Sequence, residues 1–262
     1  MIADTFRSGL FKGKTALVTG AARGIGRGIA EALAGLEATV VVNDIRAADL
    51  ERAVAAIRQK GGTAVAAAGD LADPAIADRI FEATLGEHGR IDFLINNAGR
   101  SWNVDTGEID DDTMQALVEL NFKSVVRLAR AYVRQARQRG GGGAIVQIAS
   151  TAGVAGFERR AVYAGTKFAM IGLTKVLALD HARDGITVNA VLPHVVDTEM
   201  FRSVAKPEEA ARWRAGIPMG RFATVEEVAA MVVFLCSPAA SYLTGGVYPV
   251  DGGFLAGPYG AD

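Results

Sequence analysis

Short runs of apolar, mostly β-branched residues alternate along this chain with longer stretches of helical periodicity. Most runs are continuously apolar, as strands are when helices cover both faces of a parallel sheet. The expected strands are TALVT (15–19), TVVVN (39–43), TAVAAA (63–68), IDFLI (91–95), AIVQIA (144–149), ITVNAVL (186–192) and VYPV (247–250). The expected helices include 24–36, 47–60, 74–88, 112–139, 160–181 and 224–236. This order predicts an α/β fold with a doubly wound, mostly parallel seven-stranded sheet and helices on both faces.

One domain, residues 1–262, is expected to hold the whole sheet, because no linker, repeat or low-complexity tract marks a second one. The glycines at 140–143 are expected to form a helix-to-strand loop and not a hinge. The least regular segment, about 194–222, follows the sixth expected strand. Because α/β folds place ligand contacts at that end of a strand, we expect a variable substrate loop there.

The composition limits the classes of partner. A formal net charge of −1 gives no general attraction to nucleic acid or to an anionic membrane. The one cysteine, Cys236, excludes an intrachain disulfide, and its apolar neighbours predict a buried, inert thiol. Residues 1–14 lack the layout of a signal peptide, and the apolar run near 228–236 is too short to span a bilayer. We expect a cytoplasmic protein without a metal site.

A glycine-rich turn, TGAARGIG (19–26), connects the first expected strand to a helix. Gly20, Gly24 and Gly26 permit positive φ and a close approach of the backbone to a ligand. The helix start offers unpaired N–H groups and the positive end of a dipole to a pyrophosphate. The strand–turn–helix context predicts a dinucleotide site, with residues of about 13–150 as the cofactor half and about 150–262 as the catalytic and substrate half.

Asp44 ends the second strand in VVVNDIR, twenty residues beyond Gly24. This is the distance expected for an acceptor of hydrogen bonds from the adenosine ribose hydroxyls. A carboxylate there repels a 2′-phosphate and favours NAD. Arg23 and Arg46 favour NADP instead, since either side chain could reach a 2′-phosphate. We expect NAD as cofactor, with NADP as the alternative.

Tyr163 and Lys167 lie four residues apart in YAGTK, within an expected helix. Residues at this spacing share one helix face. A tyrosine near its free pKa of about 10 is a poor base at neutral pH, and a nearby ammonium lowers that pKa. Ser150 ends the strand that precedes this helix, from where its hydroxyl can donate to the same substrate oxygen. The three residues are typical of proton exchange with an alcohol or carbonyl oxygen.

Taken together, these motifs resemble the short-chain dehydrogenase/reductase family over nearly the whole chain. The elements that carry the resemblance are TGAARGIG (19–26), GDL with Asp70, NNAG (96–99), Asn121 in ELNF, Ser150, YAGTK, Pro193, Thr198 and VDGG (250–253). The resemblance implies that Tyr163 is the general acid/base and that Lys167 lowers its pKa and holds the nicotinamide ribose. It also implies that Ser150 stabilises the substrate oxygen and that Asn121 supports a water relay to Lys167.

The resemblance places further residues at the cofactor, beside those of the glycine-rich turn. The expected cofactor-binding residues are Gly20, Arg23, Gly24, Ile25, Gly26, Asp44, Asp70, Leu71, Asn97, Ala98, Gly99, Tyr163, Lys167, Pro193, Val196 and Thr198. The expected substrate-binding residues are Ser150, Trp102, Phe157, His194, Met200 and Phe201. Charged residues of the same regions, Arg100, Glu158 and Arg159, either orient a polar or anionic group or face water.

The chain departs from the family pattern at four positions. Gln147 and Ala149 replace the common Asn and Ser of the strand before Ser150, and His194 stands where a glycine is usual. The His194 ring either packs on its neighbours or hydrogen-bonds a substrate group. Asp184 occupies a position where acyl-carrier-protein reductases usually carry a basic residue, which argues against an acidic carrier partner.

These observations favour an NAD-dependent alcohol dehydrogenase or carbonyl reductase that acts on a small molecule. An NADP-dependent 3-oxoacyl reductase is the alternative with the same chemistry. A catalytically silent nucleotide-binding scaffold is the alternative from another class, and the intact set of Asn121, Ser150, Tyr163 and Lys167 counts against it.

The helix around Asn121 has an apolar arc too wide for one core-facing stripe. The family resemblance implies that it pairs with its two-fold mate in a homodimer or homotetramer. Arg127, Arg130, Arg134 and Arg137 line the opposite side. They form either a solvated face or cross-subunit pairs with acidic residues near the other end of the helix, 110–112 and 119.

Overall fold

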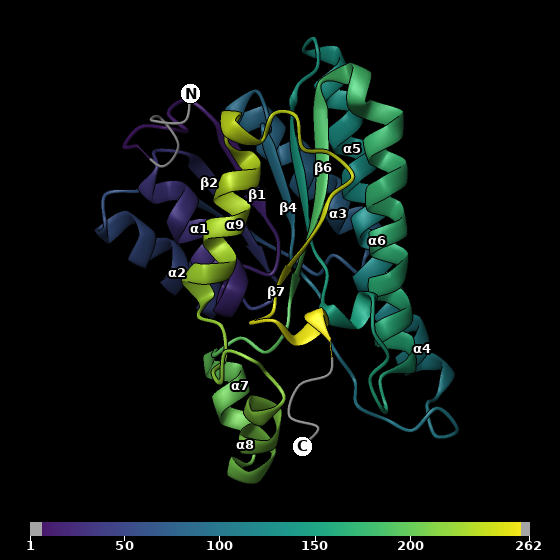
Figure 1. Ribbon diagram of the computed structural model, residues 1–262. Coiled ribbons are helices and arrows are strands. Elements are labelled where there is room, and N and C mark those ends of the chain that lie inside the picture. The colour runs from purple at the N-terminus through teal and green to yellow at the C-terminus, as the bar shows by residue number, and fades with distance from the viewer. Residues whose placement is uncertain (1–6, 258–262) are drawn as a thin grey trace.

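The computed structural model describes residues 7–257, and in this range the chain forms a seven-stranded parallel sheet (Figure 1). The strand order β3-β2-β1-β4-β5-β6-β7 confirms the predicted doubly wound α/β fold of Rossmann type. The sheet is wholly parallel, where the sequence predicted a mostly parallel one. The strands are β1 (Thr15–Val18), β2 (Thr39–Asp44), β3 (Thr63–Ala68), β4 (Phe93–Asn96), β5 (Gly143–Ile148), β6 (Ile186–Pro193) and β7 (Val247–Val250).

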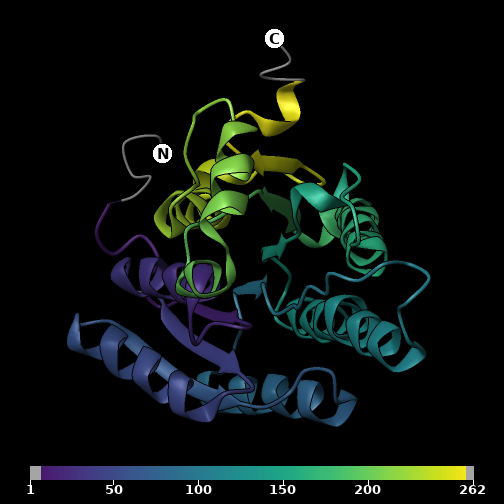
Figure 2. The same cartoon turned by 90° about the horizontal axis from the view of Figure 1, so that it is seen from below.

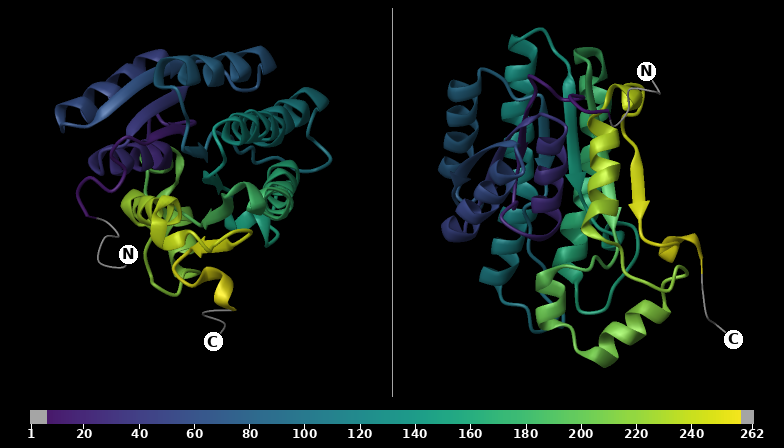
Figure 3. Two further views of the ribbon diagram at one scale, coloured as in Figure 1. Left: turned by 90° about the horizontal axis from the view of Figure 1, so that it is seen from above. Right: turned by 90° about the vertical axis from the view of Figure 1, so that its left-hand side faces the viewer.

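Helices cover both faces of the sheet, which explains why most strands read as continuously apolar (Figures 2 and 3). Buried residues of α1, α2 and α9 form a core on one face, and buried residues of α3, α5 and α6 form cores on the other. Cys236 ends α9 in the first core, and burial raises the pKa of its thiol. The helices bear these bounds: α1 (Gly24–Gly35), α2 (Ala47–Gln59), α3 (Pro74–His88), α4 (Asp111–Val118), α5 (Ser124–Gln138), α6 (Ala161–His181), α7 (Glu199–Val204), α8 (Pro207–Ala215) and α9 (Val225–Cys236).

The segment 194–222 is more regular than the sequence analysis expected, because it contains the helices α7 and α8. The Thr198 side chain caps α7 by accepting the backbone N–H of Phe201 at 3.1 Å. Pro207 starts α8, with acidic residues in the first turn and basic residues in the last turn. The two helices lie beyond the carboxyl ends of the strands in Figure 1, next to the C-terminal part of the fold.

The stretch 112–139 was predicted as one helix, and the structure interrupts it. A π-helical turn, Glu119–Lys123, separates α4 from α5 and contains the fully buried Asn121. A π turn inserts one residue into the helical repeat, which hydrophobic periodicity alone does not reveal, and such turns recur at functional sites.

Three arginines of α5 have partners within the chain. Arg127 pairs with Glu119, Arg130 lies 3.9 Å from Asp78, and Arg137 Nε donates to Asp184 at 2.8 Å. These contacts favour the solvated-face interpretation over cross-subunit pairing through Glu119.

Helix α6 has the length and apolar composition that a membrane span requires. Lys167, Met170 and Thr174 on one side of it are buried against the rest of the protein, as in a core helix of a globular domain. Its other side exposes Phe168 and Leu179, of which 50% and 82% are accessible.

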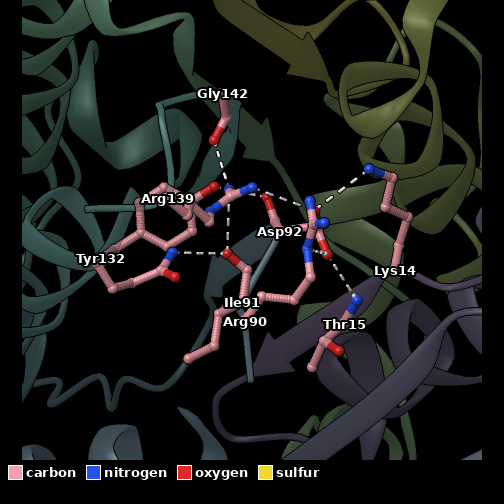
Figure 4. Close-up of polar contacts among 9 residues, drawn as sticks. Lys14, Thr15, Arg90, Ile91, Asp92, Tyr132, Arg139 and Gly142 are labelled. Atoms are coloured by element: carbon pink, nitrogen blue, oxygen red, sulfur yellow. Dashed lines mark hydrogen bonds and ion pairs between the residues drawn. The ribbon is translucent and has the colours of Figure 1, made fainter. Parts of the chain in front are cut away.

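A charged cluster closes the edge of the sheet where the strands begin (Figure 4). The Asp92 carboxylate, 2% exposed, accepts the Thr15 backbone N–H at 3.0 Å and Nε of Arg90 at 2.9 Å. Lys14 Nζ and Arg139 Nη1 lie 3.4 and 3.5 Å from the same carboxylate. One buried anion therefore connects β1, the start of β4 and the end of α5. It lies at the amino ends of the strands, whereas the catalytic motifs lie at their carboxyl ends.

The glycine loop 140–143 packs against this cluster. Arg139 Nη2 donates to the Gly142 carbonyl at 2.6 Å, and the Tyr132 hydroxyl donates to the Asp92 carbonyl at 2.5 Å. A Cβ on Gly143, whose φ is +119°, would lie 2.0 Å from the Tyr132 oxygen. The loop is thus a fitted helix-to-strand connection, as predicted.

Candidate active site

A cleft of about 580 Å³ opens at the carboxyl ends of the central strands. It includes the switch point at β1, which lies between β2 and β4 in the sheet and where the strand order reverses, the place where doubly wound sheets bind ligands. The lining residues that the sequence predicted are Gly20, Arg23, Gly24, Ile25, Gly26, Asp44, Asp70, Leu71, Asn97, Ala98, Gly99, Tyr163, Lys167, Thr198 and Met200.

The glycine-rich turn is held against the NNAG segment by hydrogen bonds. Thr19 Oγ1 accepts the backbone N–H groups of Asn97 and Ala98, both at 2.9 Å. Asn97 Nδ2 donates to the carbonyls of Thr19 and Gly20 at 2.8 and 2.9 Å. Gly20 has φ +61°, and a Cβ there would lie 2.8 Å from Ala98 Cα. The backbone therefore forms a fitted cradle in front of α1, and this cradle suits a pyrophosphate.

Asp44 lies at the end of β2 with its carboxylate turned toward this cradle. Its two oxygens accept the backbone N–H groups of Ala22 at 3.2 Å and Arg46 at 3.1 Å. The Arg46 guanidinium lies 3.3 Å from Asp44 and 3.4 Å from Asp49. Arg46 is thus engaged with carboxylates, whereas Arg23 lines the cleft with a buried Nε that has no hydrogen-bond partner among the described residues.

Tyr163 and Lys167 line the cleft, and Ser150, which is not a lining residue, hydrogen-bonds Tyr163 from behind them. Burial raises the pKa of Tyr163, while a hydrogen bond with Ser150 and the positive charge of Arg160 oppose that rise. Lys167 Nζ lies 5.8 Å from the centre of the Tyr163 ring and donates to the Ile148 carbonyl at 2.8 Å. Ser150 and Arg160 thus oppose the effect of burial on Tyr163, and the role of Lys167 in lowering the pKa of Tyr163 stays a prediction. Burial lowers the pKa of Lys167 itself to about 8.

The Asn121 side chain hydrogen-bonds the segment that follows NNAG. Its Oδ1 accepts the Arg100 backbone N–H at 3.0 Å, and its Nδ2 donates to the Arg100 carbonyl at 2.9 Å and to Thr166 Oγ1 at 3.2 Å. A Cβ on Gly99 would lie 3.2 Å from Asn121 Oδ1 and 3.8 Å from Lys167 Nζ. The π turn therefore brings the Asn121 amide beside the ammonium group.

Two buried amides lie side by side on the neighbouring strands β4 and β5. Asn96 and Gln147 are register partners on β4 and β5, and they are 1% and 0% exposed. None of their four side-chain polar atoms has a hydrogen-bond partner within the described part of the chain. Gln147, which stands where the sequence analysis expected an asparagine, therefore buries an amide without a protein partner in that part of the chain.

His194 is part of an aromatic stack near the catalytic serine. Its ring stacks on Phe254 with centroids 3.9 Å apart, and Phe157 lies 6.0 Å from the His194 ring. Its Nδ1 is 3.0 Å from Oγ1 of Thr151, the residue after Ser150. The predicted pair of Phe157 and His194 is therefore brought together, and Phe254 is a third member that the sequence did not indicate.

Other predicted residues lie away from the cleft wall. Phe201 packs on Phe222 and Trp213, with ring centroids at 4.8 and 5.9 Å, which joins α7 to α8. Pro193 and Val196 are buried and are not among the lining residues, and neither are Asn121, Ser150, Phe157 and His194. Trp102 is 51% exposed and does not line the cleft either.

Arg160 is a residue near the reacting group that the sequence analysis missed. Its guanidinium carbon lies 5.8 Å from the centre of the Tyr163 ring, and its Nη1 donates to Ser101 Oγ at 2.6 Å. Its position three residues before Tyr163 could have suggested the contact, but only the fold shows where the side chain points.

The fold and the site define a class. A parallel sheet with a dinucleotide cradle at its switch point, next to a buried tyrosine, lysine and serine, is the architecture of a nicotinamide-dependent oxidoreductase. The chain belongs to the short-chain dehydrogenase/reductase family. Residues 20–255 match the family model described as enoyl-(acyl carrier protein) reductase.

Three similar proteins illustrate the range of the family. The 3-oxoacyl-[acyl-carrier-protein] reductase FabG of Escherichia coli is 38% identical over 93% of this chain and 98% of its own. Sorbitol dehydrogenase of Cereibacter sphaeroides is 37% identical over 92% and 97%. A Beutenbergia cavernae structure described as an NAD(P)-dependent gluconate 5-dehydrogenase, with NADP bound at low occupancy, has a TM-score of 0.89, 38% identity, and coverage of 95% and 100%.

Proposed function

We propose that the chain is an NAD-dependent alcohol dehydrogenase or carbonyl reductase that interconverts a small alcohol and its ketone or aldehyde. The observation that carries this proposal is that Tyr163, hydrogen-bonded to Ser150, and Lys167 line the same cleft as the glycine cradle. A bound nicotinamide would supply the hydride acceptor or donor, while the protein supplies geometry and proton transfer.

The side chains of the site orient the substrate, transfer the proton and hold the cofactor. Ser150 donates to the substrate oxygen and orients it toward the Tyr163 hydroxyl. Tyr163 accepts the alcohol proton in oxidation and returns it in reduction. Lys167 presents its buried ammonium beside Asn121 and Gly99, where it can hold the nicotinamide ribose. Asn121 keeps the backbone after NNAG in place.

The NAD preference is supported by the surroundings of Asp44. The Arg46 guanidinium is paired with Asp44 and Asp49, so it is less available to a 2′-phosphate. Arg23 remains a cleft-lining cation that supports NADP as the alternative.

An NADP-dependent 3-oxoacyl reductase is the second candidate, favoured by the similarity to FabG. Asp184 opposes it, because the hydrogen bonds of this carboxylate with Arg137 and His181 hold its pKa low and keep an anion where an acidic carrier protein would dock. A silent scaffold has no need of the buried Lys167 beside Tyr163.

We propose that copies of the chain pair into a homodimer or homotetramer through α5 and α6. Val126, Phe168, Val176 and Leu179 are exposed on these helices, and apolar surface of this kind is usually covered by a partner. A cytoplasmic location stays a prediction from the sequence.

The test is a panel of secondary alcohols, polyols, hydroxy acids and ketones, with NAD and NADP, followed by nicotinamide absorbance. We expect turnover with NAD that Tyr163→Phe lowers by at least about a hundredfold, while the NAD dissociation constant stays within twofold. Undiminished turnover by the variant would refute the assigned mechanism.

A further inference from the structure

Two arginines flank the catalytic tyrosine on the side of the NNAG segment. Arg100 follows NNAG directly and lines the cleft together with Ser101 and Tyr163. Arg160 comes from the start of α6, with its guanidinium carbon 5.8 Å from the centre of the Tyr163 ring. Arg160 is not itself a lining residue, but its guanidinium donates to Oγ of Ser101, which does line the cleft. Two arginines from segments sixty residues apart thus lie near this part of the site, Arg100 in the cleft lining and Arg160 beside the Tyr163 ring.

Among the described residues, no carboxylate pairs with either arginine. Arg159 is paired with Glu108 at 4.0 Å, but no ion pair to a carboxylate is formed by Arg100 or Arg160 in the range 7–257. Glu199 lines the cleft from α7, next to Thr198, and Glu158 is exposed. The positive charge of Arg160 also acts on Tyr163: it lowers the pKa of the phenol, against the rise that burial causes. The wall beside Tyr163 therefore has an excess of positive charge.

We propose that Arg100 and Arg160 bind an oxyanion of the substrate, a carboxylate or a phosphate, while the reacting carbon faces Tyr163. This inference rests on the proposed function and narrows its substrate class to oxo acids and hydroxy acids, or to their phosphorylated counterparts. Guanidinium groups bind planar oxyanions through paired hydrogen bonds, and an unpaired one beside a partly buried site favours such a group over a neutral tail.

Two contact points determine how the substrate lies: the pair of Ser150 and Tyr163, and the Arg160 guanidinium. The carbonyl or hydroxyl oxygen lies between Ser150 and Tyr163, and the anion lies over the Tyr163 edge at Arg160. A short chain connects the two, because Arg160 contacts the tyrosine ring itself. Arg160 is thereby a specificity-determining residue, and Arg100 extends the same positive wall toward the cleft.

The test is binding to the enzyme saturated with NAD, since an oxidised cofactor cannot reduce an added ketone. Pyruvate, acetoacetate and levulinate are each compared with the methyl ester of the same acid, by calorimetry at low salt. Dihydroxyacetone phosphate is compared with dihydroxyacetone, so that this arm separates phosphate from carboxylate recognition.

We expect at least one anionic member to bind at least tenfold more tightly than its neutral counterpart. Arg160→Gln and the double variant Arg100→Gln/Arg160→Gln should abolish that ratio, and Arg160→Lys should keep part of it. Arg159→Gln, which removes the same charge from the neighbouring residue, should leave the ratio unchanged. An unchanged NAD dissociation constant in all variants excludes misfolding as the cause.

Equal binding within every pair, or no binding of any anion, would overturn the inference. A ratio that survives in the double variant would overturn it as well. These outcomes are separate from a failure of the proposed function, which would appear as absent NAD binding or as turnover that persists in Tyr163→Phe.

Discussion

Thr151 Oγ1 and His194 Nδ1 lie 3.0 Å apart and join the start of the substrate half to the end of β6. The other face of the same imidazole stacks on Phe254 at 3.9 Å. Burial lowers the pKa of His194, so the ring is neutral at neutral pH. The histidine that replaces the usual glycine therefore has two fixed contacts, one of them with the residue after Ser150, and it does not line the nucleotide cradle.

The first prediction concerns His194→Gly. We expect a rise in KM or an altered ranking of substrates, with a smaller effect on the NAD dissociation constant, because the variant removes the contacts of the ring with Phe254 and with Thr151, the residue after Ser150. Initial rates over a substrate panel and NAD titrations measure the two quantities. His194→Phe keeps the stacking and His194→Asn keeps a polar partner for Thr151, so together they separate the two contacts. A cofactor affinity that falls more than KM rises would place the ring at the nucleotide instead.

The second prediction concerns Asp44→Ala. We expect at least a tenfold weaker affinity for NAD and a smaller change for NADP, because the variant removes the acceptor of the ribose hydroxyls and the charge that repels a 2′-phosphate. Calorimetric titration with each nucleotide measures both. Asp44→Asn is the matched control for structure, since its amide oxygen can still accept the Ala22 N–H. No loss of NAD affinity in either variant would contradict the assigned role.

The third prediction uses the buried ammonium of Lys167. Burial lowers its pKa from 10.5 to about 8, so the unfolded chain binds this proton more tightly, and the charge destabilises the fold below pH 8. At about 1.36 kcal/mol per pH unit, the cost is about 3 kcal/mol. We expect Lys167→Met to abolish turnover but to raise the free energy of unfolding near pH 7. That gain should shrink as the pH rises from 8 toward 10.5, because the parent protein then sheds the charge. Denaturant unfolding at several pH values measures it, and a gain that grows with pH would have the wrong sign.

Much of the fold follows from local sequence, and the parts that do not have identifiable causes. The run Thr63–Ala68 and the helix Pro74–His88 were predicted with their observed bounds, because apolar runs and a proline start are local signals. The π turn at Asn121 was not predicted, since one inserted residue leaves the periodicity almost unchanged.

The site likewise has residues that could be predicted from the sequence and contacts that could not. Ser150, Tyr163 and Lys167 belong to motifs and could be predicted. The contact of Arg160 with Tyr163 and the stacking of His194 on Phe254 could not, because side-chain direction and long-range packing decide them. The lowered pKa of Lys167 likewise depends on burial, which the motif does not show.

The fourth prediction concerns the unpaired amide beneath the site. Gln147 is 0% exposed without a hydrogen-bond partner in the described structure, so its replacement by the isosteric Met should leave stability unchanged or raise it. Gln135→Met is the matched control, because Gln135 is also buried but donates to the Ile91 carbonyl at 2.8 Å. We expect the control to lose about 1–2 kcal/mol in denaturant unfolding. Equal losses in the two variants would show that the Gln147 amide is satisfied in solution.

The last prediction tests the charged cluster at the opposite edge. Asp92→Asn leaves Lys14, Arg90 and Arg139 converging without their anion, and we expect a loss of about 2–4 kcal/mol of stability. Arg90→Gln should cost less than about 1 kcal/mol, because that arginine is 41% exposed and its charge is screened by water. Denaturant unfolding measures both losses.

The NAD dissociation constant of the folded Asp92→Asn variant should stay within twofold of the parent, since the cluster lies where the strands begin and the cleft lies where they end. A stability loss no larger than that of Arg90→Gln would mean that solvent already screens the Asp92 carboxylate. A selective loss of NAD affinity without a loss of stability would instead show that the cluster and the cleft are energetically coupled. We do not expect this, because the residues of the cluster and those that line the cleft are different.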